Sequence, residues 1–277
     1  MPSPPPLNLA PISQSISTVP PTALIDQPTT RQPGFPFVTD RYRVRLAACE
    51  ADLRSAQRLR FEVFNKELNE GLESAWLTGH DEDRFDSVCT HLLVEENTTG
   101  AIVGTYRMLP GPVAASSGTG YYSAQEFDFA PYEPVRAQIL ELGRACVHHD
   151  HRNQTVVGIL WRGIAMYARS CGARYLIGCS SLTSQDPVEG AAMYRQLEEK
   201  YLAPAPFRTR PTPAYAFPLP PTEGVTTKVP RLMAAYLMIG CRICGEPAID
   251  REFKTIDFLT LMDIENVPAA VARKYMI

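Results

Sequence analysis

Residues 138–154 read QILELGRACVHHDHRNQ, and the first ten of them decide which fold to expect. Apolar side chains dominate Ile139–Val147, which predicts a strand in the protein core. Glu141 and Arg144 nevertheless lie inside this strand, with Gly143 between them. Burial of a charge without a partner costs several kcal/mol or more, so both side chains require a specific environment.

Gly143 indicates how the strand accommodates the two charges. A regular strand points Glu141 and Arg144 to opposite faces, because they are three positions apart and side chains alternate between faces at every position. Glycine inside a strand often marks a β-bulge, and a bulge at Leu142–Gly143 would bring both side chains to one face. It would also free backbone N–H groups to point into a cleft. The alternative is a buried ion pair with a purely structural role.

Composition narrows the class of protein. The chain has 277 residues, 45% of them hydrophobic and 21% charged, and a net charge of −3, which is typical of a globular protein. No basic stripe with aromatic residues indicates a nucleic-acid partner. The odd number of cysteines, seven, favours free thiols in a reducing cytoplasm. We expect no signal peptide, and the longest apolar candidate, Leu232–Ile239, is far shorter than the roughly 20 residues of a membrane span.

Two proline-rich segments divide the chain. We predict a disordered tail over residues 1–40 and a single domain over residues 41–277, with a proline-rich loop over residues 203–230. The remaining pattern predicts an α/β (α+β) domain with a mixed central sheet and helices on both faces. We expect strands over residues 43–49, 88–95, 101–109, 139–147, 174–179 and 255–263, and helices over residues 51–68, 155–170, 188–201, 230–239 and 268–275.

Further polar residues lie in predicted helices, loops and strands. Arg60 and Phe64 are four residues apart and therefore share a helix face, which makes them candidates for a common site. The alternative is a core phenylalanine beside an arginine that extends its charge into solvent. The loop DEDRFD (81–86) contains Asp83 and Asp86 and is either a solvated acidic loop or a site for an ammonium group. Its spacing differs from a calcium-binding EF-hand loop. Arg107 alternates with Thr105 and Val103, so it faces a cleft if Val103 faces inward.

Other familiar motifs are absent or incomplete. We predict no metal site. In HHDHR (148–152) the possible ligands are adjacent, whereas a zinc site needs wider spacing. The pair Cys241 and Cys244 lacks the second cysteine pair of a zinc site. The chain lacks GxSxG, a Walker A sequence and a glycine-rich dinucleotide loop. These absences argue against a serine hydrolase, a P-loop NTPase and a Rossmann oxidoreductase.

The order of the motifs resembles a known family. LRFEVF (59–64), DEDRFD, VGTYRMLP (103–110) and LELGRACV (140–147) resemble the acyl-homoserine-lactone synthases, which have a GNAT-type acyltransferase fold. The chain is more similar to the bacterial ornithine N-acyltransferase family of ornithine-lipid synthesis, whose members are often labelled hemolysins. That resemblance covers about residues 42–277 and includes YYSAQEFD (121–128) and CGEPAIDREFKTIDFLTLMDI (244–264).

The resemblance implies a mixed sheet with a splayed fourth strand and a set of site residues. Residues at the family's functional positions are Arg60, Phe64, Asp83, Asp86, Arg107, Glu141 and Arg144. HRNQTVVG (151–158) lacks the early glycines with which ordinary GNAT enzymes hold the coenzyme A pyrophosphate. The pattern is compatible with an acyl-phosphopantetheine donor on acyl carrier protein, and no other cofactor is expected.

The resemblance implies transfer of a fatty acyl group, 3-hydroxylated by family analogy, to the α-amine of ornithine or a similar amino acid. We expect Glu141 to act as the base and the backbone near Gly143 to stabilise the oxyanion. Arg144 and Arg107 would fix Glu141 and the acidic loop or bind the acceptor carboxylate, while Asp83 and Asp86 would hold its ammonium groups or order Arg60. The alternatives are a lactone-type autoinducer synthase and a non-enzymatic, hemolysin-like protein. We expect a cytoplasmic location and leave open a peripheral contact with the inner membrane.

Overall fold

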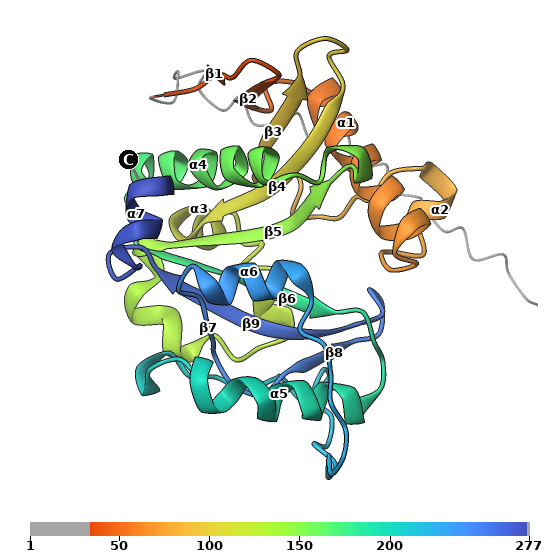
Figure 1. Ribbon diagram of the computed structural model, residues 1–277, viewed down its shortest axis with the longest axis vertical. Helices are drawn as coiled ribbons and strands as arrows, with labels where there is room; N and C mark the ends of the chain where they lie inside the picture. Colours follow the sequence, from red (N-terminus) through yellow and green to blue (C-terminus); the bar gives the residue numbers. More distant parts are fainter. Residues whose placement is uncertain (1–33, 276–277) are drawn as a thin grey trace, which may run out of the picture. The chain divides into compact units, whose positions relative to one another are not determined.

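A computed structural model describes residues 34–275, and the strands within that range form one nine-stranded mixed sheet (Figure 1). The strand order is β1-β2-β3-β4-β5-β6-β9-β7, and β8 pairs with β9. Every pair is antiparallel except β5 and β6, which run parallel. The strands are β1 (Phe37–Val38), β2 (Tyr42–Leu46), β3 (Thr90–Glu96), β4 (Ile102–Pro110), β5 (Ile139–Val147), β6 (Tyr175–Leu182), β7 (Arg242–Ile243), β8 (Ala248–Asp250) and β9 (Thr255–Asp263).

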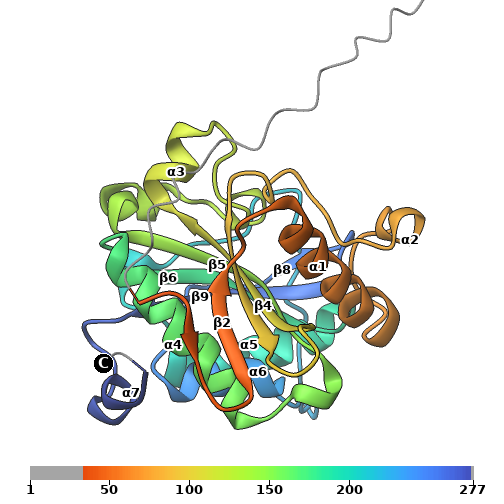
Figure 2. The ribbon, with the colours of Figure 1, turned by 90° about the horizontal axis from the view of Figure 1, so that it is seen from above.

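Helices cover both faces of the sheet, as predicted. Figure 2 shows α1 and α4 on opposite sides of β2 and β4. The core packs α4 and α6 against one face, and α1 and α3 against the other. The α-helices are α1 (Glu50–Phe61), α2 (Ala75–Thr78), α3 (Gly111–Ser116), α4 (Gln154–Ser170), α5 (Pro187–Tyr201), α6 (Arg231–Met238) and α7 (Ala269–Tyr275). Short 3₁₀ turns span Ser123–Gln125, Ala130–Gln138, His149–His151 and Ala205–Phe207.

Local sequence explains where α4 forms and how closely it packs. Asn153 precedes the helix, and its side-chain oxygen accepts a hydrogen bond from the backbone N–H of Val156 at 3.0 Å. Such a cap satisfies one of the free amides at a helix start. Gly163 lets the helix lie against the sheet, because a Cβ there would be 2.9 Å from Leu92 Cδ2. None of the helices within residues 34–275 is long and apolar enough to cross a membrane.

The sheet separates between β5 and β6. Pairing between these strands is confined to Ile139–Glu141 against Tyr175–Ile177, whereas β5 stays paired with β4 as far as Val147. Gly178 lies at the point of separation, where a Cβ would be 2.2 Å from the carbonyl oxygen of Leu142. The predicted fourth strand, β5 in the structure, is therefore splayed from its neighbour.

Several boundaries of the predicted elements were wrong. The strand expected over residues 43–49, for example, ends at Leu46. The expected tail of residues 1–40 is too long, because Phe37–Val38 form β1 and pair with β2, while residues 1–33 lie outside the described part. The expected helix over residues 51–68 changes at Glu62 into a wider π-helical turn, Glu62–Glu67. The proline-rich loop joins α5 to α6 and is held to the rest of the domain by bridges such as Phe127 to Pro211.

The side-chain alternation of β4 also differs from the prediction. Val94 of β3 pairs with Gly104 and Glu95 pairs with Ile102, so Val103 is an extra residue in β4. The extra residue turns Val103 to the α4 side, where it packs in the core cluster that contains Met108. Val103 and Arg107 therefore do not share a face.

Candidate active site

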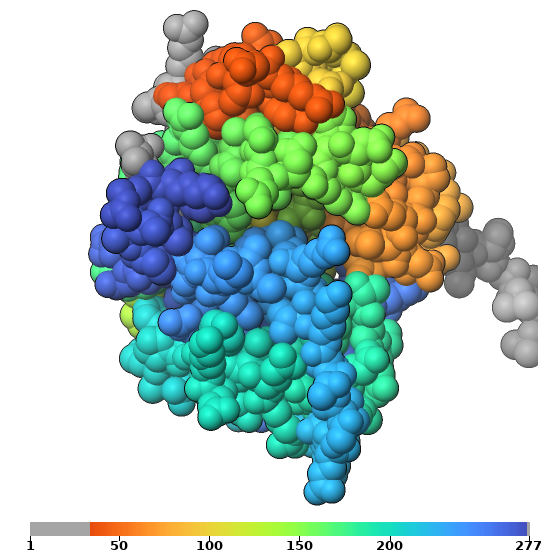
Figure 3. Space-filling view, viewed as in Figure 1, coloured from red at the N-terminus to blue at the C-terminus, as the bar shows by residue number. Residues whose placement is uncertain are grey.

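A cavity of about 470 Å³ lies where β5 leaves β6. Figure 3 shows the surface hollowed between α6 and the segment of β5 and α4. Because the strands are apart here, residues from both faces of the sheet line the cavity. The lining on the α1 side is mostly polar and includes Arg107, Tyr122, Ser123, Glu141, Arg144 and Asp257. The lining on the α4 side is mostly apolar and includes Leu142, Trp161, Leu176, Met233 and Tyr236.

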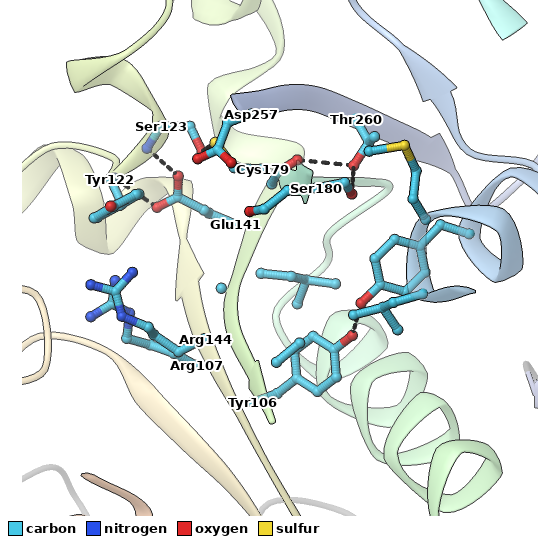
Figure 4. A pocket seen from close by; sticks show the side chains of 18 of the residues that line it. Tyr106, Arg107, Tyr122, Ser123, Glu141, Arg144, Cys179, Ser180, Asp257 and Thr260 are labelled. Atoms are coloured by element: carbon cyan, nitrogen blue, oxygen red, sulfur yellow. Dashed lines mark hydrogen bonds between the residues drawn. The ribbon is translucent and has the colours of Figure 1, made fainter. Parts of the chain in front are cut away.

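A β-bulge in β5 lies at Arg144–Ala145, and not at Leu142–Gly143 as predicted. Thr105 of β4 pairs with Cys146 and Arg107 pairs with Gly143, so Arg144 and Ala145 both oppose the single residue between them. Arg144 has a left-handed backbone with φ of 49°. This conformation costs an ordinary residue about 1–2 kcal/mol, and the ion pairs of the Arg144 side chain offset that cost. The expected consequence of a bulge is nevertheless found, since Glu141 and Arg144 face the same cavity (Figure 4).

Glu141 is held by backbone amides and not by a cation. Its Oε1 accepts a hydrogen bond from Ser123 N at 2.8 Å, and its Oε2 accepts one from Tyr122 N at 2.9 Å. No ion pair of Glu141 is present within the described residues, so the structural ion pair with Arg144 is not formed. The side chain is 5% exposed, and this burial raises the pKa of Glu141 although the two amides oppose it.

Arg60 is completely buried under the acidic loop. Its Nε lies 2.8 Å from Asp81 Oδ1, and its Nη2 lies 2.6 Å from Asp86 Oδ2. Burial alone would raise the pKa of Asp86, but Arg60 and Arg107 outweigh it and hold that pKa well below its usual range. Both simpler interpretations were wrong, because the guanidinium of Arg60 lies in the core and not in solvent, and Asp81 and Asp86 are buried.

Arg107 and Arg144 complete this network and meet at Asp83. Arg107 Nη1 lies 2.6 Å from Asp83 Oδ1, and Arg144 Nη2 lies 3.0 Å from Asp83 Oδ2. Arg144 Nε also lies 3.2 Å from Asp81 Oδ1. Figure 4 shows the two guanidinium groups side by side. Every arginine of the network therefore has aspartate partners. Of the two roles expected for the acidic loop, Asp86 takes the second and orders Arg60, while an ammonium group held by Asp83 and Asp86 stays a prediction.

Phe64 reaches the cavity from the π-helical turn. It lines the cavity and meets Phe253 edge to face, with ring centroids 5.5 Å apart. Arg60 does not line the cavity, so the face that the sequence predicted for Arg60 and Phe64 is divided by the change from α-helix to π-helix.

Two L-ornithine N(alpha)-acyltransferases are similar to this chain over most of their length. The enzyme of Brucella abortus (strain 2308) is 33% identical over 247 residues, which cover 84% of this chain and 88% of that protein. The enzyme of Agrobacterium fabrum (strain C58) is 32% identical over 239 residues, which cover 80% of this chain and 81% of that protein. This chain belongs to the L-ornithine N(alpha)-acyltransferase family.

Membership of this family makes the chain an acyltransferase. The sequence also matches the family described as "Acetyltransferase (GNAT) domain" over residues 59–162, so the GNAT fold and the enzyme class that the motifs implied are confirmed. Among solved structures, the AHL synthase LasI is 14% identical, with a TM-score of 0.46 over 79% of this chain and 88% of that chain.

The acyltransferase has a second group of buried acids that the motifs did not identify. Glu126, Cys179 and Asp257 place their side-chain oxygen and sulfur atoms within 4.8 Å of one another. Burial, with neighbouring carboxylates, raises the pKa of Asp257 to about 6 and that of Glu126 well above its usual value. The available signal was an acidic residue inside an apolar strand, TIDFLTLMD (255–263), the same signal that singled out Glu141.

The histidine-rich segment of the acyltransferase remains apart from this cavity. His148, His149 and Asp150 bring ligand atoms within 4.8 Å of one another at the surface. His151 is buried, and its Nδ1 lies 3.1 Å from the hydroxyl of Tyr42. None of these four residues lines the cavity within the described part of the chain. All seven cysteines are free, as predicted.

Proposed function

We propose that the enzyme transfers a fatty acyl group from acyl carrier protein to the α-amine of L-ornithine, the first step of ornithine-lipid synthesis. The names of its relatives specify ornithine and the α-amine. The observation that carries the chemistry is Glu141, a buried carboxylate without a counter-ion at the polar end of the cavity. An apolar region on the other side of the splayed strands is suited to the acyl chain.

Glu141 supplies the base for amide formation. A free α-amine has a pKa near 8, so much of it is protonated at neutral pH and must lose a proton before it attacks. The amine nitrogen forms a bond to the thioester carbon, and the C–S bond breaks. The ammonium form gives its first proton to solvent. After the attack, Glu141 takes a second proton from the nitrogen and returns it to the thiolate that leaves, so the amide product is neutral. The raised pKa of Glu141 makes it a better proton acceptor than an exposed glutamate, and a positioned base contributes about 10²–10⁴-fold.

The backbone of β5 is suited to the tetrahedral oxyanion. Pairing of β5 with β6 ends at Glu141, so the next four residues have no strand-pairing partner on β6. These residues, which also line the cavity, are Leu142, Gly143, Arg144 and Ala145. Amides of this open edge are candidates for donors, each worth about 10²–10³-fold. Arg107 and Arg144 act here as positioning residues that fix the acidic loop beside Glu141.

The proposal of an acyl carrier protein rests on the start of α4. HRNQTVVG lacks the early glycines that hold a pyrophosphate, and the Asn153 side chain already occupies one amide of the helix start. Arg231 lines the mouth of the cavity and has no ion-pair partner within the described residues. A cation at this position suits the single phosphodiester of phosphopantetheine and an acidic carrier.

The decisive experiment combines two donors with several acceptors. Purified enzyme is incubated with the 3-hydroxyacyl thioester of acyl carrier protein or of coenzyme A, together with ornithine, lysine, glycine, glutamine or S-adenosylmethionine. Products are identified by mass spectrometry. We expect N-acylornithine from the carrier-protein thioester. Product from S-adenosylmethionine alone would instead indicate a lactone synthase, and equal rates with both donors would overturn the choice of donor.

We further propose a peripheral contact with the inner membrane from the cytoplasmic side, because the product is a lipid. Leu232 and Met238 of α6 are exposed, and Leu232 lines the cavity mouth. Co-sedimentation with anionic vesicles tests the contact. Replacement of both residues by serine should reduce the bound fraction, and an unchanged fraction would argue against this surface.

A further inference from the structure

Glu126 and Asp257 are a pair of buried carboxylates without a cation. Glu126 is 1% exposed and Asp257 is 4% exposed. One oxygen of each, Glu126 Oε1 and Asp257 Oδ1, is buried and has no hydrogen-bond partner. Neither residue takes part in an ion pair within the described residues. Unsatisfied buried carboxylates are costly, so their retention in the core indicates a ligand that is absent from the free protein.

The pair adjoins Glu141 through Ser123 and Cys179. The backbone N–H of Ser123 donates to Glu141, and the Ser123 Oγ lies 3.4 Å from Cys179 Sγ. Cys179 Sγ in turn lies 3.7 Å from Glu126 Oε2. Asp257 and Cys179 line the same cavity as Glu141, and Figure 4 shows Asp257, Cys179 and Ser123 beside it. Asp257 therefore faces the same cavity as Glu141, and Glu126 lies directly behind that wall, within 4.8 Å of Asp257 and Cys179.

The two acids lie at the edge of an apolar core. On one side their neighbours in β6 and β9 are Ile177 and Leu259, which pack in an apolar cluster, and on the other side Asp257 pairs with Ser181. The arginines nearby, Arg107 and Arg144, are already committed to the aspartates of the acidic loop. No cation of the described residues remains to neutralise Glu126 and Asp257.

The chemistry favours an ammonium group over a metal ion. A metal bound by Cys179 requires the thiolate, whereas burial and Glu126 raise the pKa of the Cys179 thiol well above its usual value. An ammonium group carries three donors, and the two orphaned oxygens and the second oxygens of the pair offer matching acceptors.

We infer that Glu126 and Asp257 bind the side-chain ammonium of a dibasic acceptor amino acid while Glu141 faces its α-amine. This inference rests on the proposed function and adds the residues that select the acceptor. Two acids at one end and one base at the other fix which amine reacts, because the charged side-chain amine is held away from the thioester.

The test compares L-ornithine with L-norvaline, which has the same carbon chain and no side-chain amine. Acylation is measured as kcat/KM for wild type, Glu126→Gln and Asp257→Asn. In the wild type, norvaline should be poorer by about 10⁴-fold, as in sites whose buried polar groups lose their partner. Each variant should lower that preference at least about tenfold, mainly by losing activity with ornithine. Glu126→Asp, which keeps the carboxylate, should retain a larger part of the preference.

Controls separate binding from folding. Glu199→Gln makes the same chemical change on the exposed side of α5 and should leave both acceptors unaffected. Each variant replaces a buried carboxyl group whose ionisation opposes folding, as its raised pKa indicates, so its melting temperature should equal or exceed that of the wild type. A second measurement, the rise in melting temperature on addition of ornithine, should be smaller in both variants.

The outcomes distinguish this inference from the proposed function. An equal fall in activity with ornithine and norvaline would assign Glu126 and Asp257 a structural role and overturn the inference. A wild type that acylates ornithine and norvaline equally well would overturn the inference and leave the proposed function intact. A wild type that acylates glycine or glutamine but not ornithine would overturn both. A metal site would give a different result. Chelators would then abolish the activity of the wild type, and Zn²⁺ would restore it in the wild type but not in variants that lack Glu126 or Asp257.

Discussion

Glu141 and Arg144 lie three residues apart in one strand and face the same cavity, yet they do not contact each other as an ion pair. The bulge at Arg144–Ala145 turns the Arg144 side chain toward Asp81 and Asp83, while Glu141 accepts two backbone N–H groups. A direct ion pair would lower the pKa of Glu141 and weaken it as a base. The bulge therefore keeps a carboxylate free of a counter-ion in a cavity that Arg107 and Arg144 also line.

Glu141→Gln tests the base. The substitution removes the proton acceptor and leaves the volume unchanged, so kcat should fall by about 10²–10⁴-fold. One amide of Tyr122 or Ser123 would lose its acceptor, at a cost of about 1–3 kcal/mol in the free energy of unfolding. Steady-state kinetics and urea denaturation measure the two effects separately. Full activity in a folded Glu141→Gln enzyme would rule out Glu141 as the base, and Glu133→Gln at the surface is the control.

Arg60→Met tests the network beneath the acidic loop. Removal of Arg60 leaves Asp81 and Asp86 buried without full compensation, and breaking such a pair typically costs about 3–5 kcal/mol. We expect this loss in the free energy of unfolding from urea denaturation. Lys66→Met, which breaks an exposed ion pair with Glu62, should change that free energy little. Equal effects of the two substitutions would show that the buried network does not stabilise the fold.

The pH dependence of stability should have opposite signs at Asp86 and Asp257. Asp86 has a lowered pKa in the folded state, so its stabilising contribution is present at neutral pH and is lost as pH falls through the unfolded-state pKa, near 3.9, and below it. Asp257 has a raised pKa of about 6, so stability is lost as pH rises from about 4 to about 6.

Melting temperatures of Asp86→Asn and Asp257→Asn across this pH range check the two signs. The deficit of Asp86→Asn relative to wild type should shrink in acid. The advantage of Asp257→Asn should grow between about pH 4 and 6. If the melting temperatures of both variants change with pH in parallel with the wild type, the lowered pKa of Asp86 and the raised pKa of Asp257 are both contradicted.

Gly178→Ala tests the point where the sheet opens. The new Cβ would lie 2.2 Å from the Leu142 carbonyl oxygen, so β5 or β6 must move. We expect a loss of about 1–3 kcal/mol in the free energy of unfolding and a fall in activity, because the cavity lies at this junction. Gly158→Ala in α4 has a nearest contact of 3.9 Å and should stabilise by about 0.5–1 kcal/mol. A neutral Gly178→Ala would show that the opening tolerates a wider separation.

The sequence by itself determined the longer elements and much of the site, whereas the short elements β1, β7, β8, α2 and α3 were not predicted. The apolar runs of β5 and β9 were predicted with their observed ends, because alternation, length and flanking residues are local properties. Glu141 and Arg107 were singled out inside predicted strands and Phe64 on a predicted helix face, and each lines the cavity.

Only the tertiary structure decided where the charges are placed. The bulge position depends on ion pairs between Arg144 and a loop more distant in the chain, and no local pattern contains that information. The same holds for Glu126 and Asp257, which come from a short turn region and from β9 and meet only when the sheet is assembled. Hydrophobic periodicity fixes which residues face a core, whereas the partner of a buried charge is fixed by long-range packing, and at this site the partners determine the chemistry.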